Sequence, residues 1–336
     1  MKKTLLLAVG ILLAAGLSAS TRAYQRTAQP IETGPIRGDW TAKVRDTERG
    51  RKLWLSLTTE KTGQQQHWSQ MSFDLPLQDF SGLDTNANGN VRFALNREAG
   101  SATFEGLFRD GRGVGDFLFT PNLNFAASLK QMGYEEPGSQ KLFTMTIHDV
   151  GTRFMAEMKQ LGYDKVSLDK LISFRIFDVN AEFIQRMKAL GYENIPADKL
   201  TALKIHGVTE EFIREFQALS PEKLSLDKLT AFRIHGVSMK FIKEMGDLGY
   251  RDVSLDKFTT FRIHGVSPEF IKEMSEVGFE HLSADKLIQF RIHGVSAKFV
   301  REMRDMGFNN LTADDLVKLK IHGVDSDYVR RLRGLR

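Results

Sequence analysis

The sequence predicts an α+β multidomain protein in which a small antiparallel β-domain precedes an α-solenoid of short helix-turn-helix repeats. One observation behind this prediction is an aromatic column that recurs every 29 residues, at Phe125, Phe154, Phe183, Phe212, Phe241, Phe270, Phe299 and Tyr328. The other is the region before this column, where short alternating segments are separated by glycine-containing turns. A fixed repeat of this length is typical of a solenoid, and alternation with turns is typical of β-structure.

Residues 1–23 are predicted to be a secretory signal peptide. Lys2 and Lys3 precede an apolar run over 5–17, and small residues follow it. The run is shorter than the roughly 18 apolar residues of a membrane-spanning helix. We therefore expect a periplasmic or secreted protein without a transmembrane segment in the mature chain, in which 24–33 form a linker.

Composition excludes several classes of protein. The chain has no cysteine, which excludes a disulfide framework, a lipoprotein anchor and a thiolate metal site. The formal charge is +5, but Lys2, Lys3 and Arg22 would leave with the signal peptide and lower it to +2. A nearly neutral mature chain gives no electrostatic reason to expect nucleic acid as a partner.

Residues 34–124 are predicted to form the β-domain, as a sandwich or a partly open barrel. Segments of alternating character lie at 52–59, 91–95, 103–108 and 117–119. Phe104 and Phe108 would share one face of a strand, and Asp110-Gly111 suits the tight turn that follows. The three tryptophans of the chain also lie here and either pack in the core or form a surface for stacking glycans: Trp40, Trp54 and Trp68.

One stretch of the β-domain matches the first half of a calcium loop of the EF-hand type. The matching residues are Asp84, Asn86, Asn88 and Gly89. The bidentate glutamate that should end such a loop is replaced by Leu95, and the flanks are typical of strands. A turn between strands is therefore favoured over a calcium site.

Residues 125–336 are predicted to form seven repeats and a terminal half-repeat, each repeat made of two helices of about ten residues. One repeat, 268–295, reads PEFIKEMSEVGFEHLSADKLIQFRIHGV. Ser267 should cap its first helix, with Pro268 at the first helical position, and Gly278 should end it. Ser283 and Gly294 should do the same for the second helix.

Each helix of the repeat has an apolar stripe that needs a neighbour to cover it. In the first helix the stripe consists of Phe270, Ile271, Met274 and Val277, and in the second of Leu287, Phe290 and the region of Ile292. Stacking successive repeats would bury both stripes continuously.

Three positions depart from the repeat. Asp149 and Asp178 stand where later repeats have the glycine that ends the second helix, and aspartate tolerates the left-handed conformation better than most residues. Ser220-Pro221 replaces the Gly-Tyr pair that ends the first helix. A local irregularity is expected near 220.

The repeat quoted above resembles one found in exported bacterial proteins and in the extracytoplasmic regions of membrane metallopeptidases of the β-lactam-receptor sensor type. The resemblance covers about 125–336 and implies a sensing or binding region without a defined ligand. The peptidase half is absent, because the chain contains no His-Glu-x-x-His motif. No catalytic residue, metal or cofactor is implied by it.

Ladders of charged residues and histidines run through the repeats. A histidine recurs every 29 residues except at one position, where Phe177 stands. This substitution favours a structural role at helix ends over metal binding or pH sensing. The histidines are at 148, 206, 235, 264, 293 and 322. Acidic ladders accompany the basic ones, with 32 Lys and Arg against 30 Asp and Glu from 125 onward, which favours ion pairs between helices. The basic residues that could still form a binding surface are Arg214, Lys243, Lys272, Arg301, Arg233, Arg262 and Arg291.

The functional prediction is a non-enzymatic binding or scaffold module outside the cytoplasm, whose partner is an extracytoplasmic protein. The alternative is a protein that binds a cell-envelope polymer, either a glycan through the tryptophans or an anionic polymer through the basic ladders. A third hypothesis is a hydrolase without a recognisable motif. No nucleophile triad, phosphate loop or carboxylate pair can be singled out to support it.

Overall fold

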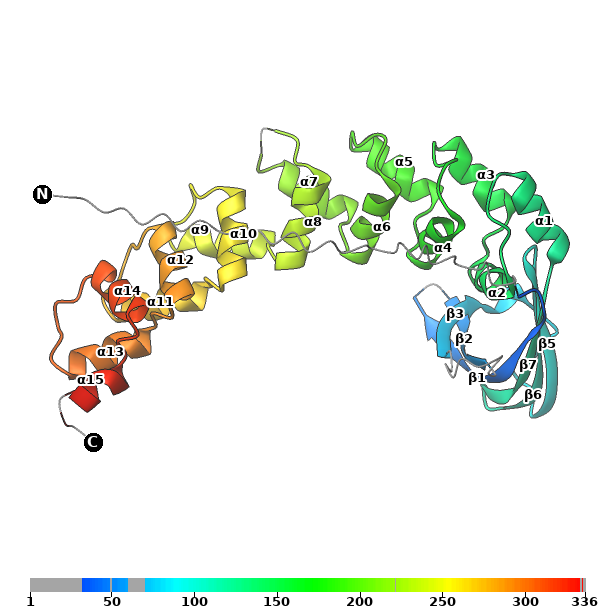
Figure 1. Cartoon of the computed structure of the whole chain (residues 1–336), viewed down its shortest axis with the longest axis horizontal. Helices are drawn as coiled ribbons and strands as arrows, with labels where there is room; N and C mark the ends of the chain where they lie inside the picture. Colours follow the sequence, from blue (N-terminus) through cyan, green and yellow to red (C-terminus); the bar gives the residue numbers. More distant parts are fainter. Residues whose placement is uncertain (1–31, 49, 60–69, 221, 333, 335–336) are drawn as a thin grey trace, which may run out of the picture.

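The computed structural model describes residues 32–48, 50–59, 70–220, 222–332 and 334 of the chain. One curled antiparallel sheet is followed by a long, curved array of helices (Figure 1). This is the α+β architecture predicted from the sequence. The predicted signal peptide and Trp68 lie outside the described residues.

Seven strands pair in the order β3-β2-β1-β7-β6-β5-β4, and each pairing is antiparallel. A short 3-10 helix, η1 (Leu77–Asp79), joins β3 to β4. The four segments predicted from alternation lie inside β2, β5, β6 and β7. The strands are β1 (Ile36–Thr47), β2 (Gly50–Thr59), β3 (Gln70–Pro76), β4 (Phe80–Ser81), β5 (Gly89–Arg97), β6 (Gly100–Arg109) and β7 (Arg112–Pro121).

The sheet curls around an aromatic core. Trp40 is fully buried and meets the ring of Phe93 edge-on, at 5.3 Å between ring centroids, and its indole N–H donates to the carbonyl of Glu105 at 3.1 Å. Trp40 is therefore a core residue and cannot stack on a glycan. Trp54 is half-buried, and the guanidinium of Arg45 lies 4.6 Å from its ring centroid.

Both predicted turns of the β-domain are present. Asp110 and Gly111 have φ of 49° and 71°, as a tight turn between β6 and β7 requires. In the loop before β5, the N–H of Asn86 donates to the Asp84 carboxylate at 2.9 Å. Leu95, at the place of the calcium-binding glutamate, is a fully buried strand residue opposite Phe80, so it belongs to the core.

The helices follow one another in pairs, and each pair is one predicted repeat. We call the odd-numbered helices first helices and the even-numbered ones second helices; α1 to α14 have eight to ten residues each. They are α1 (Leu123–Gln131), α2 (Ser139–His148), α3 (Thr152–Gln160), α4 (Leu168–Ile176), α5 (Ala181–Ala189), α6 (Ala197–Ile205), α7 (Glu210–Gln217), α8 (Leu226–His235), α9 (Met239–Asp247), α10 (Leu255–His264), α11 (Pro268–Glu276), α12 (Ala284–His293), α13 (Ala297–Asp305), α14 (Ala313–Ile321) and α15 (Ser326–Leu332).

The predicted helix ends are confirmed. The Ser267 hydroxyl accepts from the N–H of Phe270, and the Ser283 hydroxyl accepts from the N–H of Lys286, each at 3.2 Å. Gly294 ends α12 in the left-handed conformation, with φ of 71°. The chain direction is therefore set locally at each helix end.

The departures from the repeat also behave as predicted. Asp149 and Asp178 adopt the left-handed conformation, with φ of 54° and 56°. At the end of α7, Ala218 stays right-handed helical, with φ of −65° and ψ of −20°, and no left-handed glycine follows. Pro221 lies outside the described residues.

The array curves because second helices pack closer together than first helices. Consecutive second helices contact one another more extensively than consecutive first helices. The second helices α4, α6 and α8 accordingly lie on the inner side of the curve, and α3, α5 and α7 on the outer side (Figure 1). Aromatic residues of the 29-residue column, such as Phe241 and Phe270, are buried between neighbouring repeats.

Candidate interaction surface

The predicted basic residues lie in two separate rows. Arg214, Lys243, Lys272 and Arg301 lie on the first helices α7, α9, α11 and α13, and Arg233, Arg262 and Arg291 lie on the second helices α8, α10 and α12. All seven residues are exposed. Arg214 makes an ion pair of 2.6 Å with Glu210, one turn earlier on its own helix. The structure therefore does not gather these seven residues into one patch.

The basic residues of the second helices stack on an aromatic ring of their own repeat, and Arg262 and Arg291 also reach the preceding repeat. The guanidinium of Arg233 lies 4.0 Å from the ring centroid of Phe212, and that of Arg291 lies 4.9 Å from that of Phe270. Arg291 also donates through Nε to the carbonyl of His264 at 3.3 Å, at the end of the preceding second helix. These side chains stack on aromatic rings and satisfy helix-end carbonyls, so their first role is structural.

Ion pairs also cross from each second helix to the next, as predicted from the paired ladders. The Nζ of Lys228 lies 2.7 Å from the carboxylate of Asp256, for example. The pairs are Lys141–Asp169, Lys170–Asp198, Lys199–Asp227, Lys228–Asp256, Lys257–Asp285 and Lys286–Asp314. Each acidic residue of this ladder thus meets a lysine of the preceding repeat.

The histidines lie at the ends of the second helices. Their contribution to helix ending is made by the backbone, because the carbonyls of His148, His235 and His264 accept from arginines of the next repeat. Phe177, in the missing rung, is 38% exposed. In the described part of the chain no group of three or more His, Asp or Glu is placed to hold a metal ion.

From the second repeat onward, the isoleucine before each histidine position is exposed, which corrects one sequence prediction. We expected Ile292 to belong to the buried stripe of its helix, but it is 53% exposed. Ile292 is five residues after Leu287 and two after Phe290, so the helical rotation of about 100° per residue turns it away from both. The isoleucine row, whose members are 47% to 55% exposed, is Ile176, Ile205, Ile234, Ile263, Ile292 and Ile321.

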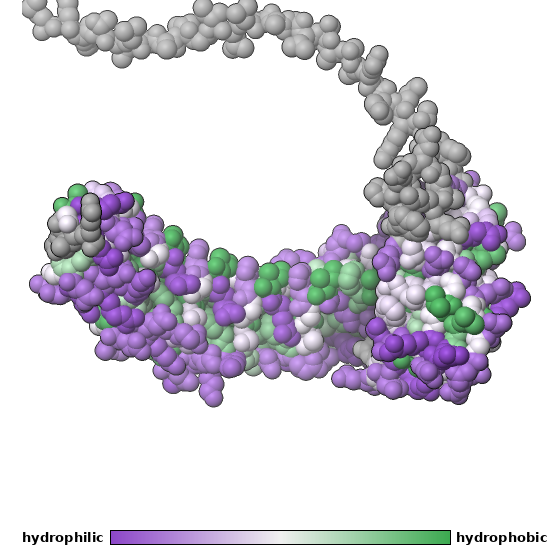
Figure 2. Space-filling model, turned by 90° about the horizontal axis from the view of Figure 1, so that it is seen from below, coloured by the Kyte–Doolittle hydropathy of each residue, from purple (hydrophilic) through white to green (hydrophobic). Residues whose placement is uncertain are grey.

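Small residues accompany the isoleucine row in four repeats. The residue three positions before the isoleucine lies on the same side of the helix and is Ser173, Ala202, Ala231 or Thr260. We call the row together with these residues the isoleucine face. In Figure 2 hydrophobic residues recur in spaced groups along the concave edge of the solenoid.

The β-domain covers the first position of this row. Ile147 of α2 occupies the same place in its repeat as Ile176 does in the next, yet it is fully buried. Phe143, one turn earlier, stacks on Phe117 of β7 at 5.6 Å between ring centroids. Arg97 at the end of β5 donates to the carbonyls of Thr146 and Ile147, both at 2.7 Å.

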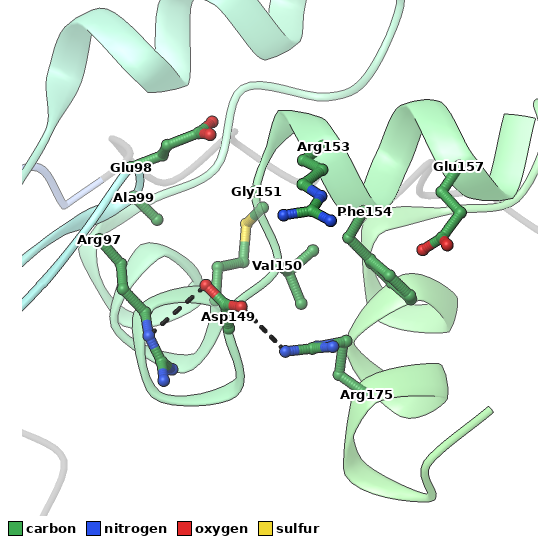
Figure 3. A pocket seen from close by; sticks show the side chains of 11 residues that line it. Arg97, Glu98, Ala99, Asp149, Val150, Gly151, Arg153, Phe154, Glu157 and Arg175 are labelled. Atoms are coloured by element: carbon green, nitrogen blue, oxygen red, sulfur yellow. Dashed lines mark hydrogen bonds and ion pairs between the residues drawn. The ribbon is translucent and has the colours of Figure 1, made fainter. Parts of the chain in front are cut away.

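A polar cleft of about 480 Å³ lies at this junction of sheet and helices (Figure 3). Asp149 stands between two arginines, with Arg97 at 3.5 Å and Arg175 at 2.9 Å. The Glu98 carboxylate accepts from the N–H and the hydroxyl of Thr152, each at 2.9 Å, and so caps α3 from outside. Because Asp149 links an arginine of the β-domain to one of α4, and Glu98 of the β-domain caps α3, the cleft is a joint between the two parts of the molecule.

The pKa of His148 is lowered at this junction. Burial lowers the pKa of its imidazole, and the positive charges of Arg97 and Arg175 lower it further. The neutral form is therefore favoured where the β-domain meets α2.

Comparison with protein-family models and with curated proteins finds no match to this chain. Among the described residues, no helix has the length and apolar character needed to cross a membrane. The candidate site therefore rests on the geometry of the chain itself.

Proposed function

We propose that the protein is a non-enzymatic binding module outside the cytoplasm and that it binds a partner protein along the isoleucine face. The observation that carries the proposal is the regular exposure of one isoleucine per repeat from Ile176 to Ile321. Single exposed apolar residues scattered over a surface are normal, whereas a regular series of them along one side of a protein marks a candidate interaction site. Six of these residues at a fixed spacing form a row.

The row offers apolar surface whose burial would contribute to binding. Completing the burial of a half-exposed isoleucine contributes about 1 kcal/mol, half of the value for a fully exposed aliphatic side chain. Burying several of these isoleucines together offsets part of the free-energy cost of association. Fixed helices also present these side chains without further ordering of the backbone.

The polymer hypothesis has less support. Arg233, Arg262 and Arg291 stack on phenylalanine rings, and the last two also donate to helix-end carbonyls. Trp40 is buried and offers no ring face to a glycan. These engagements leave the polymer hypothesis with the exposed basic residues of the first helices and the half-buried Trp54.

To test the proposal, three central isoleucines of the row are substituted in the full chain. The variant Ile205→Ser/Ile234→Ser/Ile263→Ser is compared with Lys243→Ser/Lys272→Ser/Arg301→Ser, which changes three exposed first-helix residues. Thermal melting and circular dichroism should match the parent in both, because all six positions are exposed.

Affinity purification from the native cells, quantified by mass spectrometry, then measures the bound proteins. We expect the isoleucine variant to lose at least tenfold of a specifically retained protein and the basic variant to keep it. Equal retention by both variants contradicts the proposal. Loss of envelope polysaccharide by the basic variant alone supports the polymer hypothesis instead.

A further inference from the structure

We infer that the occupant of the isoleucine face is an amphipathic α-helix of the partner, with hydrophobic residues seven positions apart over about three heptads. The inference rests on the proposed function and names the shape of the partner. The rungs concerned are Ile176, Ile205, Ile234 and Ile263, where the accompanying residues of the face are small. Three features of the face lead to this assignment.

The first feature is the lack of free donors at the centre of the face. The hydroxyl of Ser173 donates to the carbonyl of Asp169 at 2.8 Å, and that of Thr260 donates to Asp256 at 3.0 Å. Ala202 and Ala231 have no polar side-chain atom. Among these residues an extended peptide would find no donor for its carbonyls, whereas a helix satisfies its backbone internally.

The second feature is the distance between rungs. Packed helices lie about 8–10 Å apart, so the isoleucines recur at about that distance. Seven residues of an α-helix rise about 10.5 Å and return to the same side. Side chains on one face of a strand recur about every 6.8 Å and fall out of step. A polyproline helix repeats every 9.3 Å or so, but it has no internal hydrogen bonds and meets the same shortage of donors.

The third feature is the curvature of the isoleucine face, together with the β-domain that covers Ile147 at its beginning. The second helices line the inner side of the curve, so two copies placed row against row would not meet along their centres (Figure 1). An elongated helix can lie in the concavity. The row of isoleucine positions begins at Ile147, which is buried where α2 packs on the sheet of the β-domain. The backbone of this sheet, like that of a helix, is hydrogen-bonded internally.

Photo-crosslinking of the full chain in its native cells tests the inference. p-Benzoylphenylalanine is placed singly at 205, 234 and 263, and at 243 as the control on a first helix. Mass spectrometry then identifies the residue of the partner that is attached to each position. We expect all three to lie in one segment, displaced by about seven residues for every step of 29 in this chain.

Each other outcome has a defined meaning. A displacement of two or three residues shows an extended partner, and attachment to separate segments shows a folded surface; both overturn the helix and leave the proposed function standing. Attachment to a second copy of this chain also overturns the helix of a partner. A yield at the three face positions no higher than at 243 overturns the proposed function as well.

Discussion

Ile147 in α2 and Ile263 in α10 occupy the same position of the 29-residue repeat, yet the first is fully buried and the second is 53% exposed. Both helices have ten residues and end at a residue in the left-handed conformation. The difference comes from the β-domain, whose strands β5, β6 and β7 pack on α2. One face of the repeat therefore serves as core where a protein surface covers it and stays open elsewhere.

The largest expected effect on the free energy of unfolding comes from truncating Ile147, the buried isoleucine. Ile147→Ala should lower the free energy of unfolding by about 2–5 kcal/mol, because it removes a fully buried aliphatic side chain. Ile263→Ala, the same change at the exposed rung, should stay within about 0.5 kcal/mol of the parent. Urea unfolding followed by circular dichroism measures both. Equal losses of unfolding free energy in the two variants would contradict the difference in burial between Ile147 and Ile263.

A smaller effect separates the two rows of basic residues. Arg291→Met removes the stacking on Phe270 and the hydrogen bond to the His264 carbonyl, and should cost about 1 kcal/mol. Arg301→Met, at an exposed position on α13, should be nearly neutral. The same unfolding measurement compares them, and a neutral Arg291→Met would remove the structural role assigned to the second-helix row.

The smallest effect is a dependence of stability on pH at the covered end. The folded chain disfavours protonation of His148, because burial and the neighbouring arginines lower its pKa. The unfolded chain therefore binds this proton more readily, and stability falls as the pH drops below about 6.5. Above that pH the contribution vanishes. His148→Phe places in α2 the residue that the next repeat already has at Phe177, and it should lessen the decline between pH 7 and pH 5 in thermal melts.

Most of the repeat architecture could be predicted because its determinants are local. Ser267, Pro268, Gly278 and Gly294 set helix ends through their own backbone preferences, so their positions in the sequence suffice. The turn at Asp110-Gly111 is local in the same way. These elements need no knowledge of which surfaces meet.

The candidate face could not be predicted in full because exposure is a property of the packing. Ile292 looks like a core residue in the sequence, but it is exposed because no element covers its side of the helix, whereas Ile147 at the same helical position is buried. A signal was present, since the isoleucine is constant in each repeat from 176 to 321 while the core positions vary between Leu and Phe. Conversely, Arg262 and Arg291 look free in the sequence, and contacts with the preceding repeat engage them.

Hydroxyl-radical footprinting in native cells tests most directly whether the isoleucine face is covered by a partner. Oxidation of Ile205, Ile234 and Ile263 is compared between cells and the purified protein, with Leu107 and Val114 on the outer face of the sheet, 57% and 55% exposed, as internal controls. We expect the three isoleucines to be protected at least threefold in cells while the two controls react equally in both settings. Equal reactivity of the isoleucines in cells and in the purified protein would contradict the assignment of this face as the binding surface.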